Sequence, residues 1–508
     1  MTLHLGPTFC SLTLRALARY PERIAFKSAA NQVTYAGVAD MLGRMQVILA
    51  SYGIGRGSMV ALLSSNRWET WCAGVAAQAL GAGVTSLHPL ASIESHTFQL
   101  NDSRAKVLIV DASAFHDRGG ELSALHDKID VLTLGHASYG KDMLSLAQLS
   151  GSAVAKDVSV ATEMGTLNYT GGTTGRPKGV VRSNSATAQT ALSIMADFEL
   201  PANPRYLASA PISHVSGTNV LPTLLRGGTV HLISKFDPEL LLRTIEQEKI
   251  NFSLLVPTMI YTLLDHSELG RFDLSSLELL LYGASPMSPS RLAEGLERIG
   301  PVFSQLYGQS ECYPVAVLPK SDHDVSRPGL LSACGFPTAA CTVSLLDDQG
   351  NPVPMGEPGE ICVRAQHAMT EYWQQPELTR EAQAGGWLHT GDVAKADEEG
   401  RLYIVDRKKD MIISGGFNVY PREVEDVLTA HPAVSNAAVV GVADPKWGEA
   451  VQAVIVLKEG VTVAAEELID LVKSRKGSLH APKTVRFVKS LPLTSLGKVD
   501  KKALRSTQ

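Results

Sequence analysis

The sequence predicts an α/β protein with a large N-terminal domain and a small α+β domain at the C-terminus. The large domain is expected to contain two parallel-sheet αβ units and a β-barrel-like unit. Three observations support this fold class. The chain has 508 residues, more than one hydrophobic core usually organises. Short apolar runs alternate with helical patterns between residues 55 and 320, and five consecutive charged residues at 406–410 precede the last segment.

The alternating region supplies the predicted parallel sheets. Strands are expected at 58–65, 105–111, 205–213, 228–234, 250–257, 277–285 and 302–310, and helices at 68–80, 237–248 and 288–298. Buried strands separated by helices indicate parallel sheets with helices on both faces. Because these strands are too many for one sheet, two αβ units are expected. Ligands of such sheets bind beyond the carboxyl ends of the strands.

The character of the sequence changes after residue 331. Residues 331–405 alternate strand and turn signals and predict the β-rich unit. Pro421 is expected to start a helix, followed by strands at 436–444 and 449–460 and a helix at 464–475. The predicted division is therefore an N-terminal domain at 1–407, a hinge at 408–410 and a C-terminal domain at 411–508.

Composition excludes several classes of protein. The chain is 44% hydrophobic and 19% charged, and its net charge of −5 argues against nucleic acid as a partner. Its six cysteines form no C-x-x-C pair, which suits reduced thiols in the cytoplasm better than disulfides or a zinc site. The polar N-terminus does not resemble a signal peptide, and no run approaches about 20 apolar residues, so no integral membrane segment is expected.

The segment 169–179, YTGGTTGRPKG, is the strongest motif. Glycines allow close backbone approach, while hydroxyls, N–H groups and Lys178 can surround phosphate oxygens. It matches neither the Walker pattern nor the Rossmann fingerprint. From the residues alone, a phosphate-binding loop and a surface loop without a ligand both remain open.

This segment resembles the phosphate loop of the adenylate-forming (ANL) superfamily, which includes acyl-CoA synthetases, adenylation domains and luciferases. Further motifs of that family follow in order over nearly the whole chain: YGQSE at 307–311, WLHTGD at 387–392, GRLYIVDRKKDMIISGGFNVYPREVE at 400–425, and LPLTSLGKVDKKAL at 491–504. The resemblance implies an AMP-forming ligase with a mobile C-terminal domain. It uses ATP and Mg²⁺ to make an acyl-adenylate, and coenzyme A then displaces AMP.

The resemblance also implies the nucleotide site. Glu311 would hold magnesium, the ring of Tyr307 would stack on adenine, and Asp392 and Arg407 would bind the ribose. Ser310 replaces the family's usual threonine and keeps its hydroxyl. The other ATP/AMP-binding residues implied are Thr170, Gly171, Gly172, Thr173, Thr174, Gly175, Lys178, Gly283, Ala284, Ser285 and Gly308.

The C-terminal motifs imply moving parts. Lys498 would bring a cation to the carboxylate and the α-phosphate during adenylation, although a lone lysine near a chain end is normally just solvated. Lys409 occupies the position of the family's hinge residue and would absorb the rotation of the C-terminal domain. Gly415 and Gly416 would then line the channel for the coenzyme A thiol; a plain turn in a linker is the alternative.

The acyl pocket is implied less directly. It would be lined by His214, Val215, Gly217, Thr218, Gly283, Ala284, Ser285, Gly308, Gln309, Cys312 and Tyr313. His214 is also a candidate catalytic residue that positions the carboxylate; a structural histidine is the alternative. Relatives often carry a large residue where this chain has Ser213, which leaves the pocket's shape open.

The pocket residues also indicate the class of acid. No tryptophan follows Glu311, which disfavours acetate, and no charged residue in the pocket stretch would bind the ammonium group of an amino acid. A medium or large apolar acid, fatty, aryl or ring-derived, is therefore expected.

Other functions were weighed against a stand-alone acyl-CoA ligase. An enzyme that loads the phosphopantetheine of a carrier protein is the main alternative. Luciferase-like oxidation is a second. A non-catalytic nucleotide-binding protein is disfavoured because Glu311, Asp392, Arg407 and Lys498 are all present. The expected partners are a small carboxylic acid, ATP and coenzyme A, with a possible homodimer.

Overall fold

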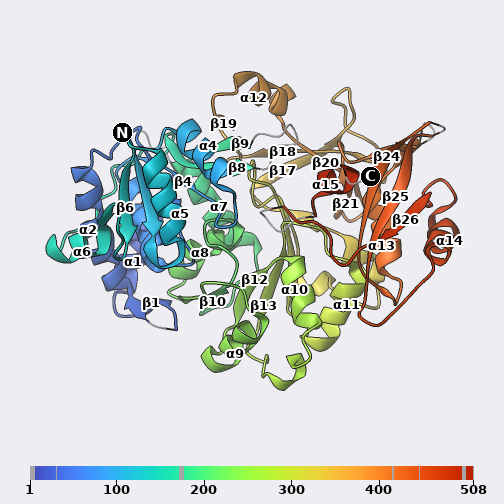
Figure 1. Ribbon diagram of the computed structural model, residues 1–508, viewed down its shortest axis with the longest axis horizontal. Coiled ribbons are helices and arrows are strands. Elements are labelled where there is room, and N and C mark those ends of the chain that lie inside the picture. Colours follow the sequence, from blue (N-terminus) through green and yellow to red (C-terminus); the bar gives the residue numbers. More distant parts are fainter. Residues whose placement is uncertain are drawn as a thin grey trace.

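The computed structural model describes residues 6–29, 31–170, 177–414, 417–445, 447–494 and 499–506 (Figure 1). It contains two large mixed sheets, a four-stranded sheet and a five-stranded sheet. The predicted strands and helices between residues 55 and 320 are confirmed, since each expected segment contains a strand or helix of the expected kind.

The first large sheet has nine strands in the order β16-β15-β14-β13-β12-β10-β11-β1-β2. Its six central strands run parallel, and β2, β15 and β16 are antiparallel at the edges. The strands are β1 (Ile24–Lys27), β2 (Gln32–Thr34), β10 (Arg205–Ala208), β11 (Thr229–Leu232), β12 (Phe252–Leu255), β13 (Leu279–Gly283), β14 (Phe303–Tyr307), β15 (Ala316–Leu318) and β16 (Phe336–Pro337). Helices α8 (Val220–Leu225), α9 (Pro238–Glu248), α10 (Pro257–Leu264) and α11 (Pro289–Arg298) connect or follow them.

The second large sheet has eight strands in the order β19-β9-β8-β4-β3-β5-β6-β7. They are β3 (Met59–Leu63), β4 (Gly83–Ser86), β5 (Val107–Asp111), β6 (Asp130–Leu134), β7 (Lys141–Asp142), β8 (Met164–Thr170), β9 (Lys178–Ser183) and β19 (Glu371–Tyr372). Its helices are α1 (Phe9–Arg19), α2 (Tyr35–Ser51), α3 (Trp68–Ala79), α4 (Ile93–Ser103), α5 (Ala112–Leu125), α6 (Met143–Leu149) and α7 (Asn184–Asp197). One core cluster includes residues from both large sheets, such as Val60 and Phe252, so the two αβ units share a hydrophobic interior.

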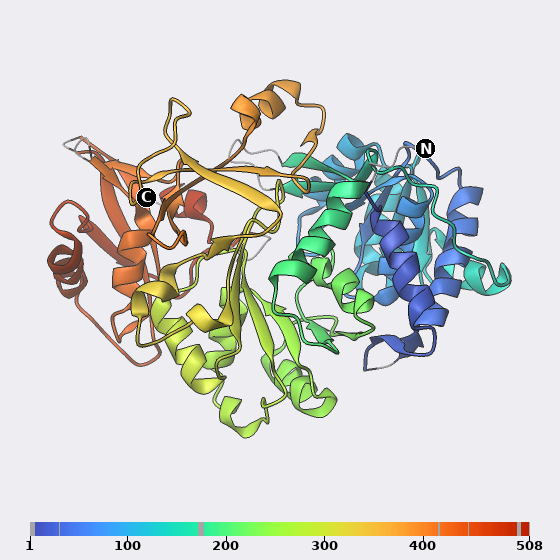
Figure 2. The same cartoon turned by 180° about the vertical axis from the view of Figure 1, so that it is seen from behind.

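The β-rich unit is a four-stranded antiparallel sheet. It contains β17 (Cys341–Leu346), β18 (Gly359–Ala365), β20 (Leu388–Ala396) and β21 (Leu402–Arg407), with the short helix α12 (Pro376–Ala382) between β19 and β20. Its edge strands β17 and β21 do not pair with each other in the part of the chain that the structure describes, so the unit is an open sheet and not a barrel. Figure 2 shows this sheet above the nine-stranded one.

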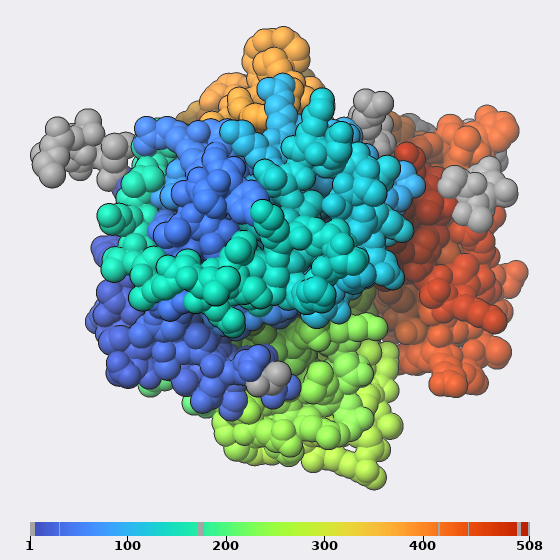
Figure 3. Space-filling model, turned by 60° about the vertical axis from the view of Figure 1, so that its left-hand side comes forward, coloured from blue at the N-terminus to red at the C-terminus, as the bar shows by residue number. Residues whose placement is uncertain are grey.

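The C-terminal part forms its own sheet and core. It contains β22 (Ile412–Ser414), β23 (Phe417–Val419), β24 (Val434–Asp444), β25 (Gly448–Leu457) and β26 (Thr484–Phe487), with helices α13 (Pro421–Thr429), α14 (Ala465–Lys476) and α15 (Lys501–Ser506). A separate cluster of buried residues, including Val424, Val439 and Leu468, packs the helices on the sheet. Figure 3 shows this part as a lobe beside the N-terminal units.

Strand β21 runs two residues into the charged segment 406–410 before the chain passes to the last sheet. The predicted start of a helix at Pro421 is confirmed, because proline suits the first turn of a helix. Within the described ranges, no helix combines the length and the apolar character that a bilayer crossing requires.

Candidate active site

A buried carboxylate, Asp392 of β20, lies at the centre of a hydrogen-bond cluster. Tyr307 Oη at the end of β14 donates to Asp392 Oδ2 at 2.7 Å, and Gln309 Nε2 donates to the same oxygen at 2.7 Å. Arg407 Nε lies 3.2 Å from Asp392 Oδ1, because β20 and β21 place these two residues opposite each other. Asp392 is only 5% exposed. The structure therefore brings together Tyr307, Asp392 and Arg407, which lie far apart in sequence.

Gln309 joins this cluster through an amide that was expected in the acyl pocket. Its Nε2 also donates to the carbonyl oxygen of Thr390 at 2.8 Å, so the amide bridges two neighbouring residues of the β20 segment. Ser310 follows in an exposed turn. After β14, Gln309 therefore faces the Asp392 cluster, whereas the next residue, Ser310, is exposed.

Glu311 lies at a second polar point, together with a tyrosine that sequence reasoning missed. Tyr372 Oη of β19 donates to Glu311 Oε1 at 2.8 Å, and Lys178 Nζ lies 5.3 Å from the centre of the Tyr372 ring. Burial, followed by the charge of Glu311, raises the pKa of Tyr372 far above its ordinary value, so this phenol remains a hydrogen-bond donor.

The carboxylate of Glu311 fits a magnesium ion. Among the described residues, no lysine or arginine forms an ion pair with it, and Tyr372 is its one side-chain hydrogen-bond partner. A hard carboxylate oxygen that is not neutralised by a cation suits a hard divalent metal. Lys178 begins β9 directly opposite Thr170 of β8, so these two strand ends flank the predicted phosphate loop.

Eight predicted site residues lie outside the described residues: Gly171, Gly172, Thr173, Thr174, Gly175, Gly415, Gly416 and Lys498. Their roles remain predictions.

The ends of β13 and β14 bring the remaining predicted nucleotide residues together. The two strands are parallel neighbours, with Gly283 opposite Leu306. A Cβ on Gly283 would lie 2.3 Å from the carbonyl oxygen of Leu306, so only glycine fits there. Ala284 follows with φ of +63°, a conformation that costs a non-glycine residue about 1–3 kcal/mol and is concentrated at functional sites. Gly308 is constrained in the same way, because a Cβ would lie 2.8 Å from the ring of Tyr313.

His214 is part of a pair of neutral histidines. Its ring centre lies 4.6 Å from that of His88 in an edge-to-face arrangement, and its Nδ1 lies 2.8 Å from Ser213 Oγ. Burial, and then the neighbouring His88, lower the pKa of His214 to about 3. Burial, and then His96, lower the pKa of His88 to about 4. Both imidazoles are therefore uncharged at neutral pH.

Two residues predicted for the acyl pocket have other contacts that explain their type. A Cβ on Gly217 would lie 1.8 Å from the carbonyl oxygen of Ile212, so the backbone turn itself requires glycine at this position. Cys312 is 1% exposed and packs in the cluster of buried residues that joins β14 to the four-stranded sheet. Their contribution to an acyl pocket remains a prediction.

Two family models match most of the chain. The model of the family described as "AMP-binding enzyme" matches residues 14–373, and that of the "AMP-binding enzyme C-terminal domain" matches residues 423–498. The chain belongs to the AMP-binding enzyme family.

Relatives of this AMP-binding enzyme cover almost its full length. A medium/long-chain-fatty-acid–CoA ligase of Mycobacterium tuberculosis is 43% identical, over 97% of this chain and 89% of that protein. A feruloyl-CoA synthase of an Amycolatopsis species is 34% identical, over 97% of this chain and 98% of that protein. The solved structure of the amide bond synthetase McbA from Marinactinospora thermotolerans is 35% identical with a TM-score of 0.91, over 98% of this chain and 99% of that one.

In this AMP-binding enzyme, the predicted hinge is tied to both of its neighbours. Lys408 Nζ lies 2.6 Å from Asp348 Oδ1 and 3.5 Å from Glu360 Oε2, both in the four-stranded sheet unit. Asp410 Oδ1 lies 3.1 Å from Arg505 of α15. Lys409 is exposed between these two anchors, a position compatible with the hinge role that the family resemblance predicts.

Proposed function

We propose that this protein joins a medium or large apolar carboxylic acid to coenzyme A. It first forms an acyl-adenylate from the acid and ATP, with release of pyrophosphate. The coenzyme A thiol then attacks the acyl carbonyl and AMP leaves. The observation that supports this proposal most strongly is the buried Asp392 with Tyr307, Gln309 and Arg407 around it.

The Asp392 cluster supplies the nucleotide end of the proposed site. A buried carboxylate that is already oriented by three donors would accept hydrogen bonds from the ribose hydroxyls without further ordering of its side chain. Arg407 would add positive charge on the same side. Glu311, two residues after Gln309 in the chain, would hold magnesium, which supplies charge neutralisation at the phosphate oxygens.

The His88–His214 pair supplies the acyl end. Since burial keeps both rings uncharged, they offer a neutral wall and at most a neutral hydrogen bond to the acid. A neutral wall favours an apolar acyl group over an amino acid, whose ammonium needs a carboxylate partner. The substrates named for the relatives, a medium- or long-chain fatty acid and a feruloyl group, have large apolar parts.

The C-terminal domain provides the switch between the two steps in this proposal. Lys498 supplies a cation to the reacting carboxylate and α-phosphate and leaves after adenylation, with Lys409 as the hinge. The passage beside Gly415 and Gly416 then admits the thiol. The domain limits of 1–407 and 411–508 belong to the same proposal.

Substitution of Lys498 tests the two-step assignment. Lys498→Ala should abolish acid-dependent ATP–pyrophosphate exchange, while thioester formation from a supplied acyl-adenylate continues. Lys502→Ala, on the exposed face of α15, is the matched control and should retain both activities. Equal loss of both half-reactions in Lys498→Ala would contradict the role of Lys498 as a group used in one step only.

A substrate panel tests the reaction class. AMP release should require both an acid and coenzyme A, and should rise with the apolar size of the acid. Replacing coenzyme A by a holo-carrier protein tests the carrier-loading alternative, and an amine tests the amide-forming chemistry named for McbA. Higher turnover with either acceptor than with coenzyme A would overturn the proposal.

We also propose that the enzyme works in the cytoplasm as a homodimer. All six cysteines are free thiols, which suits a reducing compartment. Light scattering on the purified protein measures the mass in solution directly, and a monomer at micromolar concentration would contradict the dimer.

A further inference from the structure

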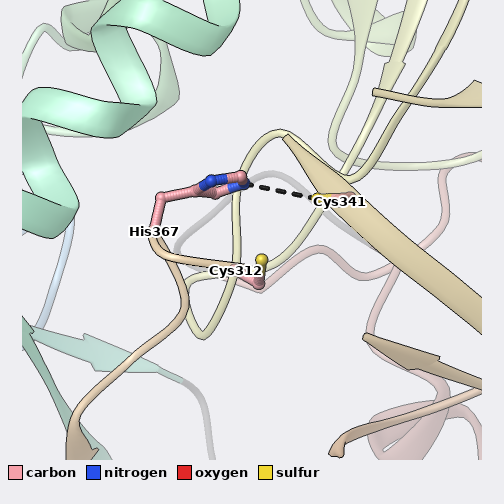
Figure 4. A group of neighbouring side chains, drawn as sticks. All are labelled: Cys312, Cys341 and His367. Carbon is pink, nitrogen blue, oxygen red and sulfur yellow. Dashed lines mark hydrogen bonds between the residues drawn. The ribbon is translucent and has the colours of Figure 1, made fainter. Parts of the chain in front are cut away.

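Three side chains whose sulfur or nitrogen atoms can bind a metal ion lie close together, and one of them is next to Glu311 in the chain. Cys312 follows Glu311, Cys341 begins β17, and His367 lies in the turn after β18 (Figure 4). The two Sγ atoms and a ring nitrogen of His367 all lie within 4.8 Å of one another. Cys341 Sγ and His367 Nε2 are 3.5 Å apart. The three residues come from three separate segments, so only the fold brings them together.

Backbone contacts hold the three segments in place independently of these side chains. Cys312 forms an antiparallel bridge with Ala368, next to His367. Met369 N donates to the carbonyl oxygen of Glu311 at 2.6 Å. On the other side, Cys341 N donates to Thr338 O at 2.9 Å. The ligand atoms are therefore positioned by a preformed frame, which lowers the ordering cost of binding an ion.

The polar atoms of this cluster share few hydrogen-bond partners, and one of them has none among the described residues. Cys312 is 1% exposed and His367 is fully buried. The carbonyl oxygen of Pro314 is the shared partner of two groups, His367 Nε2 at 2.7 Å and Cys341 Sγ at 3.4 Å. His367 Nδ1 is buried and has no hydrogen-bond partner among the described residues. Buried polar groups normally have partners, so this crowding calls for an explanation.

A buried cation stands beside the cluster. Arg182 is 6% exposed, donates through Nη2 to the carbonyl oxygen of His367 at 3.1 Å, and hydrogen-bonds the hydroxyl of Thr190. No carboxylate of the described residues forms an ion pair with it. This guanidinium therefore helps to fix the backbone of His367, and with it the position of the imidazole.

We propose that Cys312, Cys341 and His367 bind a thiophilic metal ion, of which Zn²⁺ is the representative. Two thiolates and one imidazole form a ligand set typical of zinc. In a tetrahedral zinc site neighbouring ligand atoms lie about 3.3–3.8 Å apart, and the Cys341–His367 pair at 3.5 Å already has this spacing. On binding, the two thiols release their protons to solvent and the imidazole proton moves from Nε2 to Nδ1, so that Nε2 can bind the ion and the two thiolates neutralise its charge. The carbonyl oxygen of Pro314, 2.7 Å from His367 Nε2 and 3.4 Å from Cys341 Sγ, is close enough to serve as a fourth ligand.

A second cluster in the molecule does not support such a proposal. Glu360, Cys362 and His389 also lie within 4.8 Å of one another. However, Glu360 already accepts from Gly391 N at 2.9 Å and lies 3.5 Å from Lys408 Nζ. A carboxylate that is bound by a lysine is not available to a cation, so this group serves as an internal comparison.

The bound ion would act on the active site through the chain. Cys312 directly follows Glu311, and Cys341 and His367 belong to the four-stranded sheet unit that carries Asp392. A metal would therefore fasten the segment of Glu311 to that unit. This role is structural, and it is independent of which acid or acceptor the enzyme uses.

Metal content of the full-length protein tests the site. The reduced protein is stripped with a chelator, incubated with Zn²⁺ in excess Mg²⁺, desalted, and analysed for zinc by mass spectrometry. Wild type should retain about one ion per chain. Cys341→Ser and His367→Gln should each retain less than about a tenth of that amount. Cys72→Ala, a buried cysteine in α3, and Cys362→Ser, from the comparison cluster, should retain it fully.

Cobalt provides a test that needs no variant. Co²⁺ added to the stripped wild-type protein should give the intense near-ultraviolet absorption of thiolate-to-cobalt charge transfer, and one equivalent of Zn²⁺ should remove it. Failure of wild type to retain zinc, absence of the cobalt band, zinc loss in Cys362→Ser instead, or a Cys312–Cys341 disulfide that forms in place of the metal would each overturn the proposal.

Discussion

The nucleotide end and the acyl end of the proposed site differ in whether their side chains carry charge. At one end, Asp392 is buried yet has three donors, one of them the guanidinium of Arg407. At the other end, His214 is half-buried against His88 and is kept neutral, with its pKa lowered to about 3. Burying the Asp392 carboxylate costs desolvation free energy, but its fixed donors select a ligand with matching hydrogen-bond groups. The neutral histidine pair sets no such requirement and can accept ligands of different shapes.

This difference matches what each end is proposed to bind. A nucleotide is the same in every turnover, so fixed donors and acceptors can be aimed at it. Acids differ in length and shape, and an uncharged wall discriminates among them by only about 1–3 kcal/mol per methylene group or hydroxyl. The predictions below change one end at a time.

The largest effect is expected from Asp392→Asn. The amide places donors opposite Tyr307 Oη and Gln309 Nε2 and removes the ion pair with Arg407. The value of kcat/KM for ATP should fall roughly 100- to 1,000-fold, about 3–4 kcal/mol. Acid-dependent pyrophosphate exchange measures it. Asp117→Asn, at a fully exposed side chain, controls for the lost charge and should be neutral; an effect below threefold at Asp392 would break the comparison.

His214→Ala should mainly affect the acid. Loss of the edge-to-face contact with His88 should lower kcat/KM for the acid about tenfold and leave the KM for ATP within about twofold. Steady-state kinetics over a chain-length series measure both constants. His136→Ala, at an exposed histidine, is the control. If the KM for ATP rises as much as the KM for the acid, the two ends are not separate.

The pH profile sharpens the same point. Because the pKa of His214 is about 3, this ring stays neutral above about pH 5 and should contribute no ionisation to kcat/KM for the acid between pH 5 and 9. His214→Asn should therefore keep the shape of the wild-type profile. An ionisation near pH 6.5 that disappears in this variant would show a titrating, charged His214.

Asp406 offers a second buried carboxylate, which accepts from the backbone N–H groups of Arg407 and Arg422 and, among the described residues, from no side chain. Burial raises its pKa to about 6, Lys501 opposes the shift and Glu425 adds to it. The folded protein therefore holds an extra proton between about pH 4 and 6, so stability falls as pH rises through this window and stays low above it. Asp406→Asn should remove that slope and raise the free energy of unfolding at pH 7.5 by about 1–2 kcal/mol.

Urea unfolding at several pH values measures this effect. Asp127→Asn, at an exposed carboxylate, should leave the slope unchanged. Greater loss of stability in Asp406→Asn at pH 7.5 than at pH 4 would mean that the ionised carboxylate stabilises the fold, contrary to the direction of the pKa shift.

The smallest effect is expected from Tyr307→Phe. It removes the 2.7 Å bond to Asp392 and keeps the ring, so the KM for ATP should rise about fivefold, roughly 1 kcal/mol. Gln309 and Arg407 still hold the carboxylate. A loss as large as that of Asp392→Asn would show that the hydroxyl acts on the substrate directly and does not merely orient Asp392.

Motifs of consecutive residues predicted much of the nucleotide end. YGQSE, WLHTGD and DRKKD each fix a short segment, and parallel or antiparallel pairing then brings Tyr307, Asp392 and Arg407 together. Tyr372 was missed because its partner Glu311 lies 61 residues away and no spacing rule links them. His88 was missed for the same reason.

Interpretation of isolated residue types was less informative. Gly217 was predicted to line the acyl pocket, but close approach of the Ile212 carbonyl alone requires glycine there. The cysteines lacked any metal-binding spacing, yet the fold places Cys312, Cys341 and His367 within 4.8 Å. A sequence motif reveals a functional site only where the residues that form the site lie close together in the sequence.

The most direct test is a crystal structure with a non-hydrolysable acyl-adenylate analogue, such as an acyl-sulfamoyl adenosine. The account predicts ribose hydroxyls within about 3 Å of the Asp392 carboxylate and an acyl chain that runs past His214. A ribose bound away from Asp392, or an acyl group placed away from the His88–His214 pair, would contradict it.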